Sequence, residues 1–413
     1  MNILLFAFFT IVTILYLLSI WDIKRSNPVF YFTIFNWILA SSSLLLLDLS
    51  VDVDRVYSTI IFVSFLMFGL GSSIGIKTFN IRKKYHTFFN LPLEADSNFS
   101  SNLILLVMLF SVVVVVLYYR VIGYNLSYAM LLDTGLLDFK SMRIATYSGD
   151  NYYAPGLVNQ FKNVVLPISF AILSMEFFTR NKILLFYSSL IIFVIFLLYA
   201  LLGTGQRAPI LYAFISIAMG LSIIYKIRVK WIIILSSILI LGFGFISLNS
   251  GRIDEGGNMS MVSSIFVRIF VVDQLEGLLG FRYIYELKTV WFSEWMSGVL
   301  GILPGHSGSD LDHVLYSRLH GTTRGTSSLS IPASVYYNGS MISVFIFYFL
   351  FGFSYIYLYA RLISGRKTII RCLGYGGIIF LISVFVMGSP VTLLNKGILG
   401  FILILLIRKL RIS

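Results

Sequence analysis

Long apolar runs separated by short polar segments extend along almost the whole chain. Each run lasts roughly 17–20 residues, close to the length a helix needs to cross the hydrocarbon core of a bilayer. The runs also lack the polar face that an amphipathic helix of a soluble protein would show. The pattern therefore predicts an all-α polytopic membrane protein with about eleven (10–12) transmembrane helices. We expect these near residues 3–20, 28–47, 56–75, 103–119, 157–177, 183–202, 209–225, 231–248, 340–360, 373–388 and 397–408.

The composition of the chain favours the same class. Hydrophobic residues make up 58% of it and charged residues 12%, with a mean hydropathy of +0.90. A soluble domain carries about 25% charged residues, so this chain has too few to cover a water-exposed surface. The first apolar run has neither a basic segment before it nor a small-residue cleavage site, and we expect it to remain as a helix.

The basic residues lie mainly in alternate connections between the predicted spans. Eighteen of the 31 basic residues, with four acidic ones, fall on one side, whereas the other side is close to neutral. Under the positive-inside rule the basic side is cytoplasmic. The N-terminus is then periplasmic and the C-terminus cytoplasmic. The net charge of +13 is explained by topology in this way and does not predict a nucleic-acid partner.

One external connection is much longer than the others. It divides the chain into an N-terminal bundle of about eight helices (1–248), a large periplasmic loop (249–339) and about three C-terminal helices (340–413). A loop of this length usually has structure and function of its own. Its apolar stretches Val262–Val272 and Val290–Leu303 predict amphipathic helices at the membrane surface, where Trp291 and Trp295 suit the interface.

Ionisable side chains are almost absent from the predicted spans. Lys162 and Glu176 lie near span ends, and we expect Lys162 to extend its ammonium group towards the interface. Transporters driven by ions or protons generally carry charged residues at mid-membrane, so this pattern argues against that class.

Arginines gather instead at the external boundary. Arg207 follows two glycines in the short turn Gly203–Pro209, where backbone amides and a guanidinium can together bind a phosphate. Four further arginines in the long loop extend this candidate pyrophosphate site: Arg252, Arg268, Arg282 and Arg324. For Arg268 a salt bridge with Asp273 or Glu276 is the alternative.

Candidates for acid–base chemistry lie in the same loops. His320 stands between two arginines, and a histidine suits a general base that accepts a proton from a sugar hydroxyl. Glu276 is the rival base. The pair Asp310 and Asp312 imitates a carboxylate metal site, but a three-residue pattern is weak and we predict no metal or other cofactor.

Three local segments and the overall arrangement resemble the Wzy-type O-antigen and capsular polysaccharide repeat-unit polymerases. The turn ending in Arg207 is similar to a glycine/serine–arginine turn of that family and of the related O-antigen ligases. Ser250-Gly251-Arg252, just after a span, resembles a second arginine position shared with the ligases. The stretch from His320 to Gly339 resembles the end of the polymerase loop. The number of spans and the large external loop before the last few spans also agree.

The resemblance implies a helical membrane glycosyltransferase of the GT-C type in the bacterial inner membrane. Such an enzyme transfers a growing glycan from undecaprenyl diphosphate to the next lipid-linked repeat unit at the periplasmic face. Catalytic roles would fall to His320, Glu276 and Arg207, with the arginines stabilising the lipid diphosphate as it leaves. The resemblance also implies that aromatic residues of the external loops bind the sugars, with Tyr147, Tyr336 and Tyr337 as the candidates. The implied partners are undecaprenyl-diphosphate-linked oligosaccharides, membrane lipid, and a chain-length regulator and flippase of the same pathway.

Two other functions remain open at this point. An O-antigen ligase uses the same donor with a different acceptor, and the sequence separates it poorly from a polymerase. A flippase for lipid-linked oligosaccharides belongs to a different class, which tends to have short external loops and cationic residues inside the spans. This chain shows the reverse pattern.

Overall fold

A computed structural model of the chain describes residues 1–94, 101–126, 155–180, 182–204, 208–225, 267, 271–301, 308–321 and 326–407. These residues fold into helices, and the described part contains no strand beyond one isolated antiparallel bridge between Ser330 and Met387. The longer helices are α1 (Asn2–Ser19), α2 (Pro28–Leu46), α3 (Asp52–Thr78), α5 (Ser101–Ile122), α9 (Leu166–Thr179), α10 (Ile183–Leu202), α11 (Ala208–Tyr225), α17 (Ile331–Ile363) and α18 (Ile369–Ser383). The shorter ones are α4 (Ile81–Asn90), α8 (Pro155–Asn159), α14 (Asp273–Tyr285), α15 (Ser293–Leu300), α16 (Leu311–His320), α19 (Val391–Asn395) and α20 (Ile398–Ile407).

The chain is a helical polytopic membrane protein, as predicted. In the described residues, seven helical runs are long and apolar enough to cross a bilayer; the run Gly156–Thr179 joins α8 and α9 through a π-helical turn, Gln160–Val165. Ten of the eleven predicted spans coincide with or overlap helices, and the bounds of α10 match the prediction. The span expected at 231–248 lies outside the described residues, so the count of eleven stays a prediction.

The helix expected at 340–360 begins nine residues earlier, at Ile331. Ser330 precedes the helix, and Pro332 lies in its first turn. Proline has no backbone N–H, but the N–H groups of a first turn have no partner within the helix, so no hydrogen bond is lost. The helix is broken at Gly339 and Ser340, and Ser340 has a positive φ of 61°. The outer part of α17 therefore belongs to the region that the sequence analysis assigned to the loop.

The next helix also differs from its predicted span. α18 ends at Ser383, five residues before the predicted end. The residues that follow pair with the segment before α17: Gly388 N–H donates to the Leu329 carbonyl (2.7 Å), and Ile331 N–H donates to that of Val386 (3.3 Å). Backbone pairing replaces the helical hydrogen bonds of this stretch.

Close packing of α3 against α17 forms the largest contact between elements. Gly71 lies against the Phe349 carbonyl and Gly352 against the Phe68 carbonyl, so a side chain at either glycine would collide with the opposite backbone. Small residues of this kind let transmembrane helices approach closely. The buried core continues from these helices through α2 and α18 to Leu278, Phe281 and Ile284 of α14.

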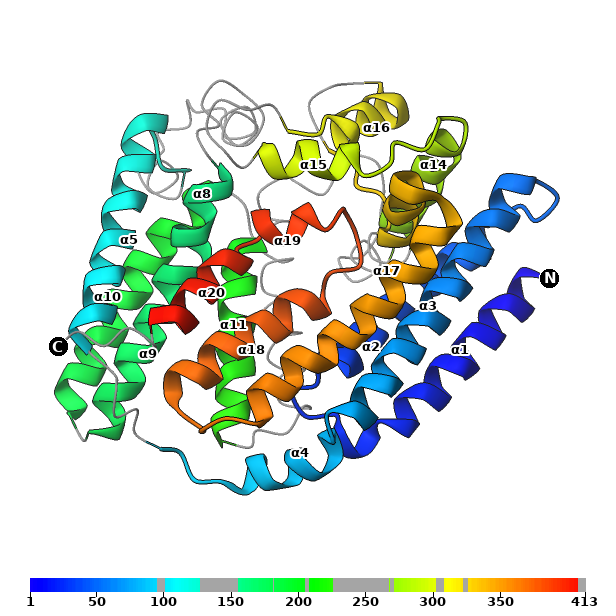
Figure 1. The fold of residues 1–413 in the computed structure, drawn as a ribbon. Coiled ribbons are helices and arrows are strands. Elements are labelled where there is room, and N and C mark those ends of the chain that lie inside the picture. Colours follow the sequence, from blue (N-terminus) through cyan, green and yellow to red (C-terminus); the bar gives the residue numbers. More distant parts are fainter. Residues whose placement is uncertain are drawn as a thin grey trace.

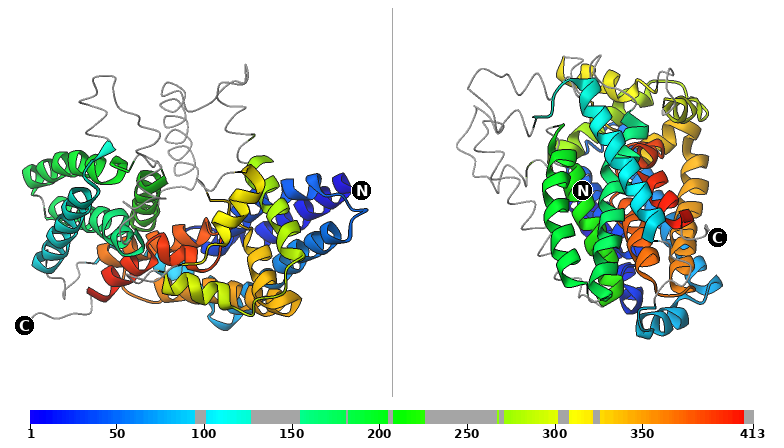
Figure 2. Two further views of the ribbon diagram at one scale, coloured as in Figure 1. Left: turned by 90° about the horizontal axis from the view of Figure 1, so that it is seen from above. Right: turned by 90° about the vertical axis from the view of Figure 1, so that its left-hand side faces the viewer.

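Loops predicted to share a side of the membrane meet in the structure. At one end, α4 lies across the bundle (Figure 1), Arg82 pairs with Asp22, and Lys367 donates to the Leu91 carbonyl. At the other end, α14, α15 and α16 lie together, and Arg282 of α14 reaches the α2–α3 turn. Figure 2 shows the same separation of α4 from the loop helices. These described connections are therefore grouped as the charge pattern predicts, and the side of the membrane that each end faces stays a prediction.

Lys162 does not extend towards an interface, as the sequence analysis expected. Its side chain is 2% exposed and lies on the π-helical turn Gln160–Val165, which packs against α5. Its Nζ lies 5.1 Å from the ring centroid of Tyr118, and among the described residues it forms no ion pair. The amino group of Lys162 is thus buried in the bundle beside an aromatic ring.

Replacing Lys162 by methionine is expected to stabilise the folded protein by about 1 kcal/mol or more. Methionine keeps the volume of the side chain and removes a charge whose burial is unfavourable. Thermal unfolding in detergent measures the effect. Lys182→Met, at the exposed start of α10, is the matched control and should stay within about 0.5 kcal/mol. A lower unfolding midpoint for Lys162→Met would show that the ammonium group stabilises the fold.

Candidate functional site

Five of the predicted site residues are described by the structure: Glu276, Arg282, His320, Tyr336 and Tyr337. All five lie on α14, on α16 or on the outer part of α17, at one end of the bundle (Figure 1). The other five, Arg207, Arg252, Arg268, Arg324 and Tyr147, lie outside the described residues. Their roles stay predictions.

Helix α14 carries the first candidate base. Its buried residues Leu278, Phe281 and Ile284 recur at helical spacing and join the main core. Glu276 lies outside this apolar stripe and is half-buried among polar neighbours. The core contacts of α14 therefore fix the backbone that carries the carboxylate.

Helix α16 carries the second candidate base at its last residue, His320. Leu315 is buried in the core and anchors the helix. Gly321 follows in the left-handed conformation (φ 69°), and its N–H donates to the Ser317 carbonyl (2.9 Å). A glycine in this conformation is a common end of a helix. The pair His320-Gly321 thus places the imidazole at the end of a helix instead of within a loop.

The two candidate bases, treated as rivals in the sequence analysis, contact one another. His320 Nε2 lies 3.3 Å from Glu276 Oε1, and the Ser327 hydroxyl donates to Glu276 Oε2 (2.9 Å). The Tyr316 ring lies beside the imidazole, with 4.3 Å between centroids. Nδ1 of His320 makes no hydrogen bond to any described residue. We call Glu276 and His320 the dyad.

The dyad has the geometry of an oriented general base. A carboxylate that accepts a hydrogen bond from one imidazole nitrogen fixes the tautomer and stabilises the imidazolium ion. Ser327 holds the second carboxylate oxygen, so Glu276 is itself oriented. Nδ1 is then the nitrogen that can take a proton from a substrate hydroxyl.

Arg282 is paired with a carboxylate that the sequence analysis did not consider. Its Nε donates to Asp54 Oδ1 (2.8 Å) and its Nη2 to Asp54 Oδ2 (2.6 Å). The Asp54 side chain is fully buried and that of Arg282 is 37% exposed. Asp48 N–H also donates to Asp54 Oδ2 (2.6 Å). In this structure the fork of Arg282 ties α14 to the α2–α3 turn, and any role in pyrophosphate binding stays a prediction.

The two described candidate tyrosines face different neighbours. The ring of Tyr336 stacks on that of Tyr285 (6.4 Å between centroids) and lies near Phe281 (5.6 Å). The carbonyl of Tyr337 accepts a hydrogen bond from Val290 N–H (3.1 Å). Tyr336 thus belongs to a small aromatic group beside the dyad's helix α14, whereas the backbone of Tyr337 fixes the segment before α15.

The two tryptophans expected at the membrane interface differ in their exposure and contacts. Trp291 is exposed, as that role requires. Trp295 turns inward instead, because its indole N–H donates to the Ser334 hydroxyl (3.1 Å) and its ring packs on Phe347. One tryptophan is therefore available to lipid, and the other holds α15 against α17.

The carboxyl of Asp312 has a raised pKa. No group of three metal-ligating side chains occurs in the part of the chain that the structure describes. Burial raises the pKa of Asp312 from its ordinary value of 3.8 to about 6, and the nearby negative charge of Glu294 adds to the shift. The Ser328 hydroxyl donates to its Oδ2 (3.3 Å) and opposes the shift.

Replacing Asp312 by asparagine is expected to stabilise the protein increasingly as pH rises from about 4 to 6. Because the pKa of Asp312 is raised in the folded state, the native protein binds more protons than the unfolded chain in this window. The wild-type protein therefore loses stability as pH rises, whereas asparagine at this position does not titrate. Above pH 6 the gain should be constant, on the order of 2 kcal/mol. Thermal unfolding across pH 4–8 tests this, with Asp310→Asn as the control. Parallel curves for the Asp312 variant and the wild type would contradict it.

Comparison of the chain with protein-family models, with curated proteins and with solved structures finds no match.

Proposed function

We propose that the protein is a glycosyltransferase that polymerises undecaprenyl-diphosphate-linked oligosaccharide repeat units at the periplasmic face of a bacterial inner membrane. The observation that supports the proposal most is the dyad: Glu276 of α14 and His320 of α16, far apart in sequence, lie 3.3 Å apart at one end of a membrane bundle. The resemblance of the loop and its arginines to the Wzy-type polymerases supplies the substrate class.

The dyad supplies half of the chemistry that such a transfer needs. The acceptor hydroxyl oxygen forms a bond to the anomeric carbon of the donor glycan, and the bond from that carbon to the diphosphate oxygen breaks. The hydroxyl proton goes to His320 Nδ1, and the bonding electrons leave with the lipid diphosphate. Negative charge grows on that leaving group, where the arginines are expected to act.

The surroundings of the dyad suit substrates anchored in lipid. Apolar side chains at the same end of the bundle are exposed on the α14–α15 connection and on α15, among them Trp291, Phe292 and Met296. At a membrane surface these residues insert among the lipids. A polyprenyl tail in the bilayer and a glycan in water would then meet at the dyad.

The test is a reaction of the purified full-length protein in nanodiscs with a synthetic undecaprenyl-diphosphate-linked repeat unit. The expected products are dimers and longer glycans on one lipid, with undecaprenyl diphosphate released in equal amount. Products made only when a lipid A core acceptor is added would identify a ligase instead. If neither longer glycans nor undecaprenyl diphosphate form under either condition, both transferases are ruled out. Movement of intact substrate between leaflets would then favour a flippase.

A further inference from the structure

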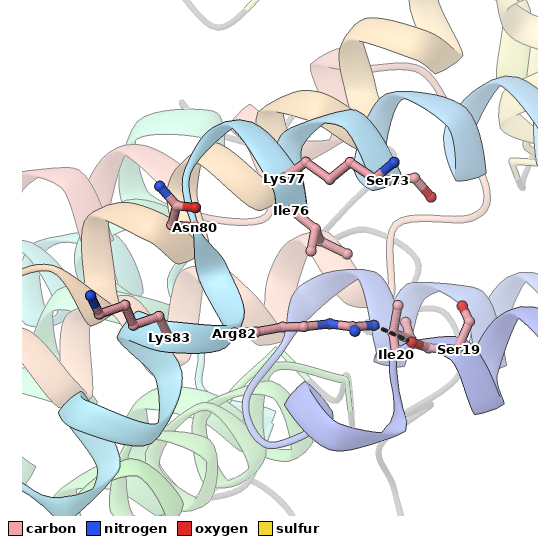
Figure 3. A pocket seen from close by; sticks show the side chains of 8 residues that line it. All are labelled: Ser19, Ile20, Ser73, Ile76, Lys77, Asn80, Arg82 and Lys83. Carbon is pink, nitrogen blue, oxygen red and sulfur yellow. Dashed lines mark hydrogen bonds between the residues drawn. The ribbon is translucent and has the colours of Figure 1, made fainter.

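A cavity opens among α1, α3 and α4 at the basic end of the bundle (Figure 3), whereas the dyad lies on α14 and α16 at the other end (Figure 1). Its volume is about 420 Å³. Lys77 contributes from the end of α3, Arg82 and Lys83 contribute from the start of α4, and Ser19 closes it at the end of α1. In Figure 3, Arg82 crosses from α4 to Ser19, while Lys77 extends from the opposite wall. Helices α3 and α4 thus place three cations around one hollow that α1 also lines.

Two of these cations are not neutralised. Arg82 Nε lies 3.2 Å from Asp22 Oδ2, and Arg82 Nη2 donates to the Ser19 carbonyl (2.9 Å). Lys77 and Lys83 form no ion pair with any residue that the structure describes. The hollow therefore has an excess of positive charge, which favours an anionic ligand with several acceptor oxygens.

Apolar surfaces lead from the membrane region to this cavity. On α3, the exposed residues Leu66, Leu70 and Ile74 recur every four positions on one face and end just before Lys77. On α1, which is largely uncovered, the exposed residues Leu15 and Leu18 end at Ser19. In a bilayer these faces contact acyl chains, so the cavity lies at the depth of the headgroups.

We propose that this cavity binds the phosphate headgroup of an anionic diacyl phospholipid from the adjacent leaflet. The ammonium groups of Lys77 and Lys83 neutralise the negative charge of the phosphate. Arg82 links the lipid site to α1 through its hydrogen bond to the Ser19 carbonyl. The charge pattern predicts that this leaflet is the cytoplasmic one. Basic pockets between transmembrane helices on that side are suited to anionic headgroups. The site is independent of glycosyl transfer.

Native mass spectrometry of the purified full-length protein tests the proposal. The protein is titrated with phosphatidylglycerol, with phosphatidylcholine and, separately, with inorganic phosphate. We expect one tight site for phosphatidylglycerol, weakened about thirtyfold in the Lys77→Gln/Lys83→Gln variant, since each basic residue near the lipid contributes about a factor of five. The Lys77→Arg/Lys83→Arg variant keeps the charge and should keep the site. Lys84→Gln, on the same helix but outside the cavity, is the matched control.

The outcomes separate the sources of the anion. Equal retention of phosphatidylglycerol by all variants, or equal binding of phosphatidylcholine, would overturn the site in favour of ordinary surrounding lipid. Binding of inorganic phosphate at the same concentration would overturn the lipid assignment in favour of a soluble anion. Weaker binding of phosphatidylglycerol by the Lys77→Gln/Lys83→Gln variant, with normal binding by the other variants, supports the proposal.

Discussion

Replacing His320 by alanine is expected to slow glycan polymerisation by about 10²- to 10⁴-fold, the range that a positioned general base contributes. The substitution removes the proton acceptor at Nδ1. His320 lies at the exposed end of α16, next to a glycine that ends the helix, so its loss should leave the fold unchanged. The rate at which the purified protein lengthens a synthetic lipid-linked repeat unit measures the effect. His86→Ala, an exposed histidine of α4 at the opposite end, is the matched control.

The dyad makes a sharper prediction for paired substitutions. If Glu276 acts only by orienting and stabilising His320, Glu276→Gln should lose less activity than His320→Ala. The double variant should then be no slower than His320→Ala alone, because residues that act as a unit are not additive. Losses that multiply in the double variant would show two independent roles. Full activity of His320→Ala would remove the dyad from the catalytic site.

Replacing Arg282 by methionine is expected to lower the free energy of unfolding by about 2–3 kcal/mol. It leaves the fully buried Asp54 carboxylate without its cation. Breaking a fully buried ion pair has an effect of about 3–5 kcal/mol, and the expected value is smaller here because Arg282 is 37% exposed. Thermal or denaturant unfolding in detergent gives the measurement. The nearby pair Arg55–Asp52 is the control: both side chains are exposed (59% and 81%), so Arg55→Met should change stability by less than about 1 kcal/mol.

The partner substitution separates structure from ligand binding at Arg282. Asp54→Asn combined with Arg282→Met removes both charges, so most of the lost stability should return. If Arg282 serves only to hold α14 on the α2–α3 turn, this restored variant should polymerise glycan at nearly the normal rate. A stable but inactive double variant would instead support the predicted contact between Arg282 and the lipid diphosphate.

The spans were predictable because an apolar run of bilayer length has few alternatives to a membrane helix. The start of α17 was not, because Ile331–Asn338 mixes tyrosine and small polar residues that also suit a loop. Helix α14 was missed for a similar reason: Gly277 and Gly280 lower its helical propensity, although the spacing of Leu278, Phe281 and Ile284 was a usable signal.

At the candidate site, residue types were predictable and pairings were not. Glu276 and His320 were both predicted from their chemistry, but only the packing of α14 and α16 shows that they contact one another. The Arg282–Asp54 pair joins positions 228 residues apart, and nothing local marks Asp54 as its partner. Lys162 was misplaced because its position near the end of a span suggested access to the interface, whereas the π-helical turn that carries it is buried.

The break at Gly339 and Ser340 gives α17 a mechanical property that an uninterrupted helix would lack. A transmembrane helix adjusts its tilt when the thickness of the surrounding bilayer changes. In α17 the two segments meet at a non-helical step, so the inner one can tilt without turning the outer one. The geometry around Tyr336 and the dyad is therefore expected to change little with lipid composition, and the proposed glycan transfer should proceed alike in thin and thick membranes.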